Sequence, residues 1–483
     1  MAVKKKLLEA AVEQAKKPKP SKFSLPKDYQ SPEFFEVKDY GDAPLPGAPM
    51  PANIPTVGRI NIGPNPDAER AALRHAEQSG IPYTPITEMV KVDPEFGARV
   101  AREYELMPHD PGNLRVKEAY SQLIEELGGQ YEQMLSAGIK PEFDLNPYAQ
   151  SPYLSLLDML ENKRLKVYPT RAGFGSDADF DASQNPLLAL SGFKISGQPA
   201  TYNDLFRAVH DFQGHGKTGA GFRAMGEENA YLSHAGTFSP LANRALATET
   251  RGQNSWLNFG PYGDTNRTAG IEDTIFADQK TGLLPSWAVM KGLPEADVRR
   301  KRAIDLARAN PANLSGALDE AGNLTLQHRS KKQLDRIDPA FDGTGYDQNK
   351  RDYINNRANE DYVQRAYYGL NTDVDPYKPE YGVGSVVHEV KIPVEQLYDA
   401  EANLDNIWKG KTSRERELNV WKNGYSGYYA NHPQLGKVAV VFDPLDVTKK
   451  LAVVLSTGAV IEDYASGDGQ SNGQDLPGLI GNF

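Results

Sequence analysis

The pattern of apolar residues changes once along the chain, and this change constrains the fold more than any other feature. Up to about residue 309, apolar residues recur at the spacing of amphipathic helices, as in Leu114–Leu135. After residue 320, β-branched residues alternate or cluster, and the strings VVHEVKIPV, KVAVVFDPLDV and KLAVVLSTGAVI predict strands. The sequence therefore predicts an α+β protein with a mainly helical middle domain and a C-terminal mixed β-sheet domain.

Two helices can be bounded in the first part of the chain. Asn65 is expected to cap a helix over Pro66–Ser79, and a second helix is expected over Leu114–Leu135. We expect Gly128 and Gly129 to kink or divide the second helix, because glycine pairs are common at helix kinks.

The N-terminal segment contains nine prolines between Pro18 and Pro55. Proline lacks an N–H group and fixes φ, so this density predicts an extended arm. Before the arm, seven Lys and two Glu in the first 22 residues, with apolar residues at helical spacing, predict a short basic helix. The helix is expected to be solvated or to dock on a partner protein, and the arm to wrap the protein itself or a neighbouring subunit.

These patterns divide the chain into five predicted segments. They are the basic helix and Pro-rich arm (1–60), a helical region (61–145), the middle domain (146–295), the C-terminal domain (310–460) and a flexible tail rich in Gly, Ser, Asn and Asp (461–483).

Composition excludes several kinds of site. The 483 residues include no cysteine, which excludes disulfides, thiolate metal sites and cysteine nucleophiles, so any metal must be bound by His, Asp or Glu. The formal net charge of -10 argues against a nucleic-acid partner, because phosphate binding needs clustered positive charge. No stretch has the length and apolarity of a membrane span, and the N-terminus lacks the apolar run of a signal peptide.

The strongest candidate site is a histidine cluster in the middle domain, where His210, His215 and His234 fall within 25 residues. Asn203 is expected to cap the helix that carries His210, and Gly214 is expected to turn the chain so that His215 returns towards His210. Two imidazoles and one carboxylate suit Zn or Fe and leave positions open for water or substrate.

Several residues could complete or support this site. The candidate third ligands are Glu227, Glu228 and Glu249, and Asp211 could orient the histidines. The alternative is a metal-free polar network, in which the histidines and Asp211 pair with Arg207, Arg223 and Arg251.

The string HDFQGH resembles the HExxGH ligand pair of the pterin-dependent aromatic amino acid hydroxylases, in which a downstream Glu is the third iron ligand. This resemblance implies His210 and His215 as ligands and Glu249, in ATETRGQNSW, as the third. The alternates are Asp211, Glu227, Glu228 and His234. Because Asp replaces the Glu that follows the first His of the motif, we apply the resemblance to ligand geometry and not to the reaction.

Two longer resemblances concern origin and a second activity. The block from YNDLFRAVHDFQGHGKTGAGFRAMGEENAY through TETRGQNSWLNFGPYG resembles a segment of large tailed-bacteriophage proteins, which implies a virion or early-infection role. The strings LTLQHRSKKQLDRIDPAFDGTG and QRAYYGL, with the strands that follow, resemble the ADP-ribosyltransferase-like domains of phage and mobile-element polyvalent proteins.

The second resemblance implies a NAD site. His328 and Ser330 match the family's His-x-Ser/Thr element, and an aromatic wall for the nicotinamide is implied at Tyr367 or Tyr368. The implied catalytic residues are His328, Ser330 and Tyr368, and the implied NAD-binding residues are His328, Gly343, Thr344, Gly345 and Tyr367.

One position departs from the transferase pattern. The family's late Glu, which stabilises the developing positive charge, falls at Val438, next to Lys437. Either another carboxylate such as Glu389 takes its place or the domain no longer transfers ADP-ribose.

Three hypotheses on function follow. The first is a phage virion-associated protein whose arm binds neighbouring virion subunits, and which is delivered to the host cytoplasm to act on a host protein through the metal or NAD site. The second is a structural virion protein in which both domains are retired enzymes. The third is a soluble host-modifying enzyme made early in infection.

Overall fold

The computed structural model describes part of the chain. The described residues are 64–86, 88–148, 152–173, 181–267, 269, 273–309, 314, 317–330, 333–339, 364–370, 386–432, 436–453 and 460–461. The basic helix and arm predicted for 1–60, the Gly-Thr-Gly element at 343–345 and the tail predicted for 461–483, except Ile461, lie outside them. The chain divides into two compact units, formed mainly by residues up to Arg299 and from Arg300 onward.

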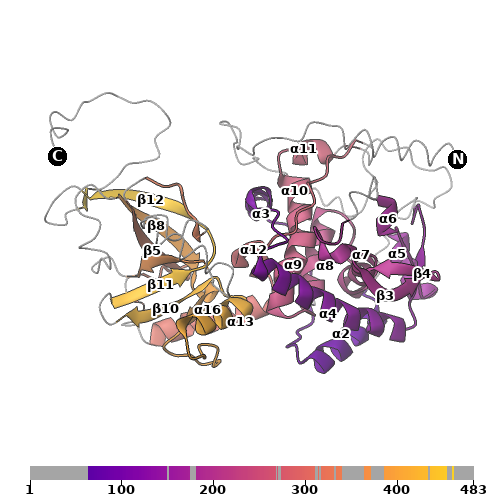
Figure 1. Ribbon diagram of the computed structural model, residues 1–483, viewed down its shortest axis with the longest axis horizontal. Helices are drawn as coiled ribbons and strands as arrows, with labels where there is room; N and C mark the ends of the chain where they lie inside the picture. The colour runs from indigo at the N-terminus through magenta and orange to yellow at the C-terminus, as the bar shows by residue number, and fades with distance from the viewer. Residues whose placement is uncertain are drawn as a thin grey trace. The chain divides into compact units, whose positions relative to one another are not determined.

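The first unit is mainly helical (Figure 1). Its helices are α2 (Pro66–Ser79), α3 (Pro94–Leu106), α4 (Leu114–Ser136), α5 (Leu154–Glu161), α6 (Thr170–Gly173), η1 (Pro186–Leu188), α7 (Tyr202–Val209), η2 (His210–Gly216), α8 (Ala224–Ala235), α9 (Pro240–Ala247), η3 (Thr248–Gly252), α10 (Gln253–Phe259), α11 (Gly263–Asn266) and α12 (Ser286–Met290), and α13 (Pro294–Ala309) contains the boundary between the units. Of these, η1 is a 3-10 helix, whereas η2 and η3 are π-helices. Two small sheets complete the unit: β1 (Lys140–Phe143) pairs in parallel with β2 (Arg164–Val167), and β3 (Leu190–Ile195) pairs antiparallel with β4 (Gln198–Thr201).

Helix α4 is central to the core of the first unit. Asn113 caps it, and it runs unbroken for 23 residues, so the expected division at Gly128 and Gly129 does not occur. A Cβ at Gly129 would lie 3.3 Å from the ring of His75 on α2, so the glycine allows close packing of the two helices. Helix α2 has the predicted bounds and the predicted Asn65 cap, whose side chain accepts from the Asp67 N–H.

The second unit is built on a mixed sheet. Its elements are β5 (Asn323–Ser330), β6 (Arg336–Ile337), β7 (Ala366–Gly369), β8 (Val386–Pro393), η5 (Val394–Gln396), β9 (Leu397–Asp399), α16 (Ser413–Lys422), β10 (Gly427–His432), β11 (Gly436–Val441), β12 (Leu445–Val453) and β13 (Val460–Ile461). The strand order is β13-β12-β8-β5-β7-β11-β10-β9, and β6 pairs with β12. Strands β9 and β10 are parallel and the other named pairs are antiparallel.

Each unit has its own hydrophobic core, and together they confirm the predicted α+β class. The first core includes side chains from Ala68 to Ala296, and the second includes Leu324, Leu326, Val390 and Val441. Over the described residues, no helix is both long enough and apolar enough to cross a bilayer.

Candidate metal centre

The two histidines of the HDFQGH string lie on a π-helix. Helix α7 begins at the capping box of Thr201 and Asp204, and its buried Leu205 and Phe206 fix it to the core. Asn203, the expected cap, instead donates from Nδ2 to Thr170 Oγ1 at 3.1 Å.

From His210 to Gly216 the backbone continues as the π-helix η2, so the turn expected at Gly214 does not form. On an α-helix, residues five apart point about 140° away from each other. A π-helix bonds residue i to residue i+5, which brings such residues to one face. The π-helix therefore explains how a five-residue spacing can present His210 and His215 together.

Glycine allows helix α8 to approach η2 closely. A Cβ at Gly214 would lie 3.0 Å from the Ala230 carbonyl oxygen and 3.2 Å from the Ala230 Cβ. Any larger residue would push α8 away from the histidines. Glu227 lies in the first turn of α8, where a negative charge is favourable, and its carboxylate reaches the imidazoles.

His210, His215 and Glu227 form the one group among the described residues with three ligand atoms suited to a metal ion. These atoms all lie within 4.8 Å of one another. Glu227 Oε2 is 3.7 Å from His210 Nε2 and 3.5 Å from His215 Nε2. Both separations exceed a normal hydrogen bond of roughly 2.7–3.2 Å. Two ligands of a tetrahedral ion, each about 2.1 Å from it, are about 3.4 Å apart, so the spacing fits an ion between them.

The three ligands differ in burial and charge. The His215 side chain is 1% exposed and the His210 side chain 11%, whereas the Glu227 side chain is 29% exposed. Burial by itself would raise the pKa of Glu227, but the nearby His215 and His210 outweigh it and hold that pKa well below its usual range. Burial would lower the pKa of His215, but Glu227 outweighs burial and raises it. The pocket thus favours a carboxylate beside the imidazoles.

Hydrogen bonds at Nδ1, the ring nitrogen away from Glu227, orient both imidazoles. The Nδ1 of His215 is 3.1 Å from the carbonyl oxygen of Ala220, and the Nδ1 of His210 is 3.2 Å from the Nδ1 of His234. The ring of Phe222 stacks on His215 with centroids 4.1 Å apart. In each ligand histidine it is Nε2 that faces Glu227.

Glu249, the third ligand expected from the hydroxylase-like spacing, has other partners. It lies on η3, where Oε1 accepts from the Tyr120 hydroxyl at 2.5 Å and Oε2 accepts from Gln253 at 3.1 Å. Burial raises the pKa of Glu249 to about 7, although both hydrogen bonds lower it. The structure thus brings the alternate Glu227, and not Glu249, to the histidines.

The other alternates surround the three ligands. Glu228, a candidate third ligand, instead pairs with Arg251, whose Nε donates to it at 3.0 Å. The pKa of Asp211 is raised by burial, which outweighs the lowering effect of His215 and His210. His234 is fully buried, and burial holds its pKa well below the usual value.

Sequence reasoning missed Gln130, which supports His234. Its Oε1 lies 2.9 Å from the Nε2 of His234, and its side chain is fully buried on α4. The signal was its place on a buried helix face, seven residues after Leu123 and three after Leu127. A polar side chain at such a position needs a buried partner.

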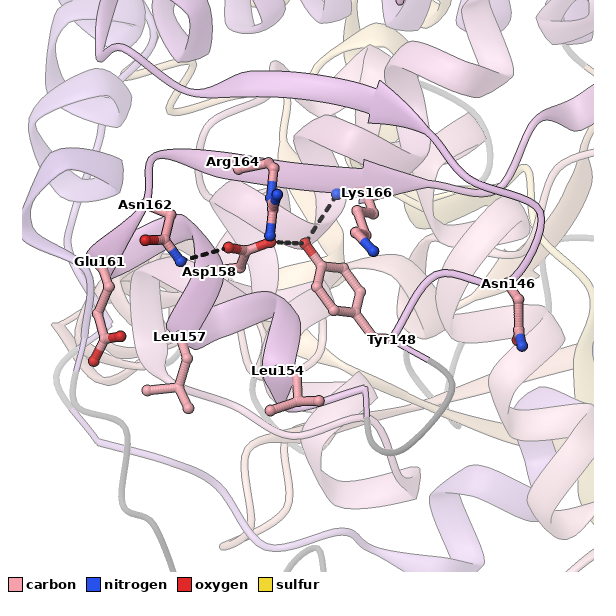
Figure 2. Close-up of a pocket in the computed structure, with 9 residues that line it drawn as sticks. All are labelled: Asn146, Tyr148, Leu154, Leu157, Asp158, Glu161, Asn162, Arg164 and Lys166. Carbon is pink, nitrogen blue, oxygen red and sulfur yellow. Dashed lines mark hydrogen bonds and ion pairs between the residues drawn. The ribbon is translucent and has the colours of Figure 1, made fainter. Parts of the chain in front are cut away.

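A separate pocket of about 430 Å³ lies at α5 and β2, and Figure 2 shows its lining residues. Its polar groups are largely paired with one another. Asp158 Oδ2 accepts from the Tyr148 hydroxyl at 3.1 Å and from Arg164 Nε at 2.9 Å, and Asp158 Oδ1 accepts from Asn162 at 2.8 Å (Figure 2). Both carboxylate oxygens of Asp158 therefore have partners on the pocket wall.

In the second unit, the predicted NAD-site residues lie on two neighbouring strands. His328 and Ser330 are on β5, and Tyr367 and Tyr368 are on β7. The Nδ1 of His328 is 2.9 Å from the carbonyl oxygen of Tyr367, and the His328 ring lies 5.5 Å from that of Tyr368. Tyr368 is fully buried, whereas Tyr367 is 36% exposed, so Tyr367 is the better placed of the two to meet a ligand.

The late Glu of the transferase pattern is absent at Val438, and Glu389 is the candidate to replace it. Both residues lie on strands next to β5 and β7. Val438 is 7% exposed on β11, opposite Gly369. Glu389 is on β8 opposite Gln327, whose amide donates to its Oε1 at 3.1 Å. Gly343, Thr344 and Gly345 lie outside the described residues.

Comparison of the chain with models of protein families, with curated proteins and with solved structures finds no match.

Proposed function

We propose that the first unit carries a catalytic divalent-metal centre with His210 Nε2, His215 Nε2 and a Glu227 oxygen as ligands. The observation that carries the proposal is the separation of 3.5 and 3.7 Å between the carboxylate and the two imidazoles. A direct ion pair would close these gaps, whereas a shared ion needs them.

Three protein ligands are typical of a catalytic metal and four of a structural one. A ligand set of two His and one Glu suits both zinc and non-haem iron(II) and leaves positions for water or substrate. A metal held in this way would act as a Lewis acid and lower the pKa of bound water, so metal-assisted hydrolysis is the proposed reaction class. The partly exposed Glu227 marks the side from which a small polar substrate would approach.

The test is the metal content of the purified full-length chain compared with Glu227→Gln and Glu249→Gln. We expect about one equivalent of zinc or iron in the parent, a loss of most of it in Glu227→Gln, and parental content in Glu249→Gln. The two substitutions are matched, because each replaces one carboxylate by an amide of the same shape.

Each other outcome has a definite meaning. Loss of metal in Glu249→Gln alone would support the hydroxylase-like ligand set and overturn this one. No metal in any of the three proteins after growth and purification with both metals supplied would leave the histidines as a polar network.

The role in a tailed-phage particle and NAD-dependent transfer by the second unit rest on sequence resemblance alone. They remain predictions beside the metal proposal and do not support it.

A further inference from the structure

Hydrogen bonds link Thr237, Gln130, His234 and His210 in series. The carbonyl oxygen of Thr237 decides which atom donates and which accepts in each of them. The amide nitrogen of Gln130 lies 3.2 Å from the carbonyl oxygen of Thr237, which can only accept. This contact fixes the orientation of the amide, because a flipped amide would place two oxygens against each other. The Oε1 of Gln130 therefore faces the Nε2 of His234 at 2.9 Å and accepts its proton.

The position of this proton determines the tautomer of His234. The side chain is fully buried, and its ring contacts are with Phe206, Phe238 and His210, which do not compensate a positive charge. A neutral imidazole with its proton on Nε2 has a lone pair on Nδ1. The Nδ1 of His234 therefore accepts, and the Nδ1 of His210 donates across the 3.2 Å between them.

The protonation of His215 follows from one direct contact with a backbone carbonyl. Its Nδ1 lies 3.1 Å from the Ala220 carbonyl oxygen, so Nδ1 donates. In both ligand histidines Nδ1 therefore carries a proton, and Nε2 is the nitrogen that faces the carboxylate of Glu227. Two different partners thus place a proton on Nδ1 of both histidines, on one face of η2.

We propose that Gln130 and His234 are positioning residues that fix Nε2 of His210 as its metal-binding atom. This inference rests on the proposed function, which it deepens. It also assigns His234 a role other than that of a ligand, because both of its ring nitrogens are used, one by Gln130 and one by His210. Such outer partners fix ring orientation and raise the basicity of the ligand.

The first test reads the tautomers directly in the metal-free full-length protein. The chain has eight histidines, so selective ¹⁵N-histidine labelling gives a tractable long-range ¹H–¹⁵N spectrum, which is assigned by single substitutions. We expect a proton on Nδ1 of His210 and of His215, and the Nε2–H form for His234. A spectrum in which Nδ1 of His210 carries no proton would overturn the proposal.

The second test compares His234→Asn with His234→Leu. The Asn side chain retains an oxygen near the position of Nδ1 that can accept from His210, whereas Leu removes the acceptor. We expect the zinc dissociation constant, measured by chelator competition, to rise about 10- to 100-fold in His234→Leu and by much less in His234→Asn. Equal weakening in both variants would mean that His234 acts only through packing.

The two proposals can fail separately. A parent with the expected tautomers that binds neither zinc nor iron would overturn the metal proposal and leave the hydrogen-bond chain intact. A parent that binds metal with His210 in the other tautomer would overturn the positioning role alone.

Discussion

Glu249 is expected to make the stability of the protein depend on pH. Burial raises its pKa to about 7 from the ordinary value of 4.5, so the folded state keeps a proton that the unfolded state releases between these values. The contribution of Glu249 to the free energy of unfolding should therefore fall as pH rises from about 4.5 to 7. The full shift corresponds to roughly 3 kcal/mol, and partial solvent exposure of the side chain reduces this to about 2 kcal/mol.

Urea unfolding of the parent and of Glu249→Gln at pH 5 and pH 8 measures this effect. We expect the free energy of unfolding of the parent to fall by about 2 kcal/mol relative to that of the variant between the two pH values, because an amide cannot release the proton. The same pH dependence in both proteins would show that Glu249 does not contribute to it.

At the residue scale, the sequence pointed to the histidine pair and named Glu227 among the candidate third ligands, but it placed Glu249 first. His210 and His215 stand out because histidines are rare in this chain and these two are close together. The choice between Glu227 and Glu249 depends on how α8 packs against η2, which is set by the close approach at Gly214 and not by any spacing along the chain. Gln130 is 104 residues from His234, so their contact also requires the tertiary fold.

At the element scale, the capping box of α7 is expected to carry measurable stability. Thr201 Oγ1 accepts from the Asp204 N–H at 3.1 Å, and Asp204 accepts from the Thr201 N–H at 2.8 Å. Thr201→Ala should lower the free energy of unfolding by about 1 kcal/mol or somewhat more, because a buried N–H loses its acceptor.

Asn203→Ala is the matched control, because it removes a polar side chain from the same turn without removing the cap. Its side chain makes one hydrogen bond, to Thr170, so we expect about half the effect of Thr201→Ala or less in urea unfolding. A larger effect at Asn203 than at Thr201 would contradict the capping assignment.

The sequence predicted regular elements better than irregular ones. The bounds of α2 follow from its Asn65 cap and the helical spacing of its apolar residues, and strand β8 follows from its β-branched residues. The structure confirms both elements. The π-helix η2 was missed because period analysis assumes one hydrogen-bond register throughout a helix. A five-residue spacing then seemed to need a turn at Gly214.

At the scale of the whole molecule, the two hydrophobic cores predict two thermal transitions. A ligand that binds only one folded unit stabilises that unit, by about 2.7 kcal/mol when its concentration is 100 times the dissociation constant. We expect excess zinc to raise the transition temperature of one unit and leave the other unchanged in calorimetry.

Glu227→Gln provides the control for this experiment. The zinc-dependent increase should disappear in the variant, while the insensitive transition stays where it was. An increase of the same size in the variant would place the bound zinc elsewhere in the chain.

The α+β class was predictable because one change of pattern separates helical from strand-forming sequence. The order of the strands in the sheet was not predictable. Strand β5 pairs with β8 and β7, and the positions of these strands in the chain do not indicate which strand lies at the centre. Pairing of distant strands is decided by packing and register, which single-strand patterns do not encode.

The unequal burial of the three proposed ligands bears on how fast a bound ion would exchange. His215 is almost completely enclosed, whereas 29% of the Glu227 side chain meets solvent. An ion bound at the proposed site would therefore enter and leave past the carboxylate, and the two imidazoles would release it last. The lifetime of the bound ion would then be governed by the motion of one side chain, so two proteins with equal affinity could differ widely in the rate at which a chelator strips them.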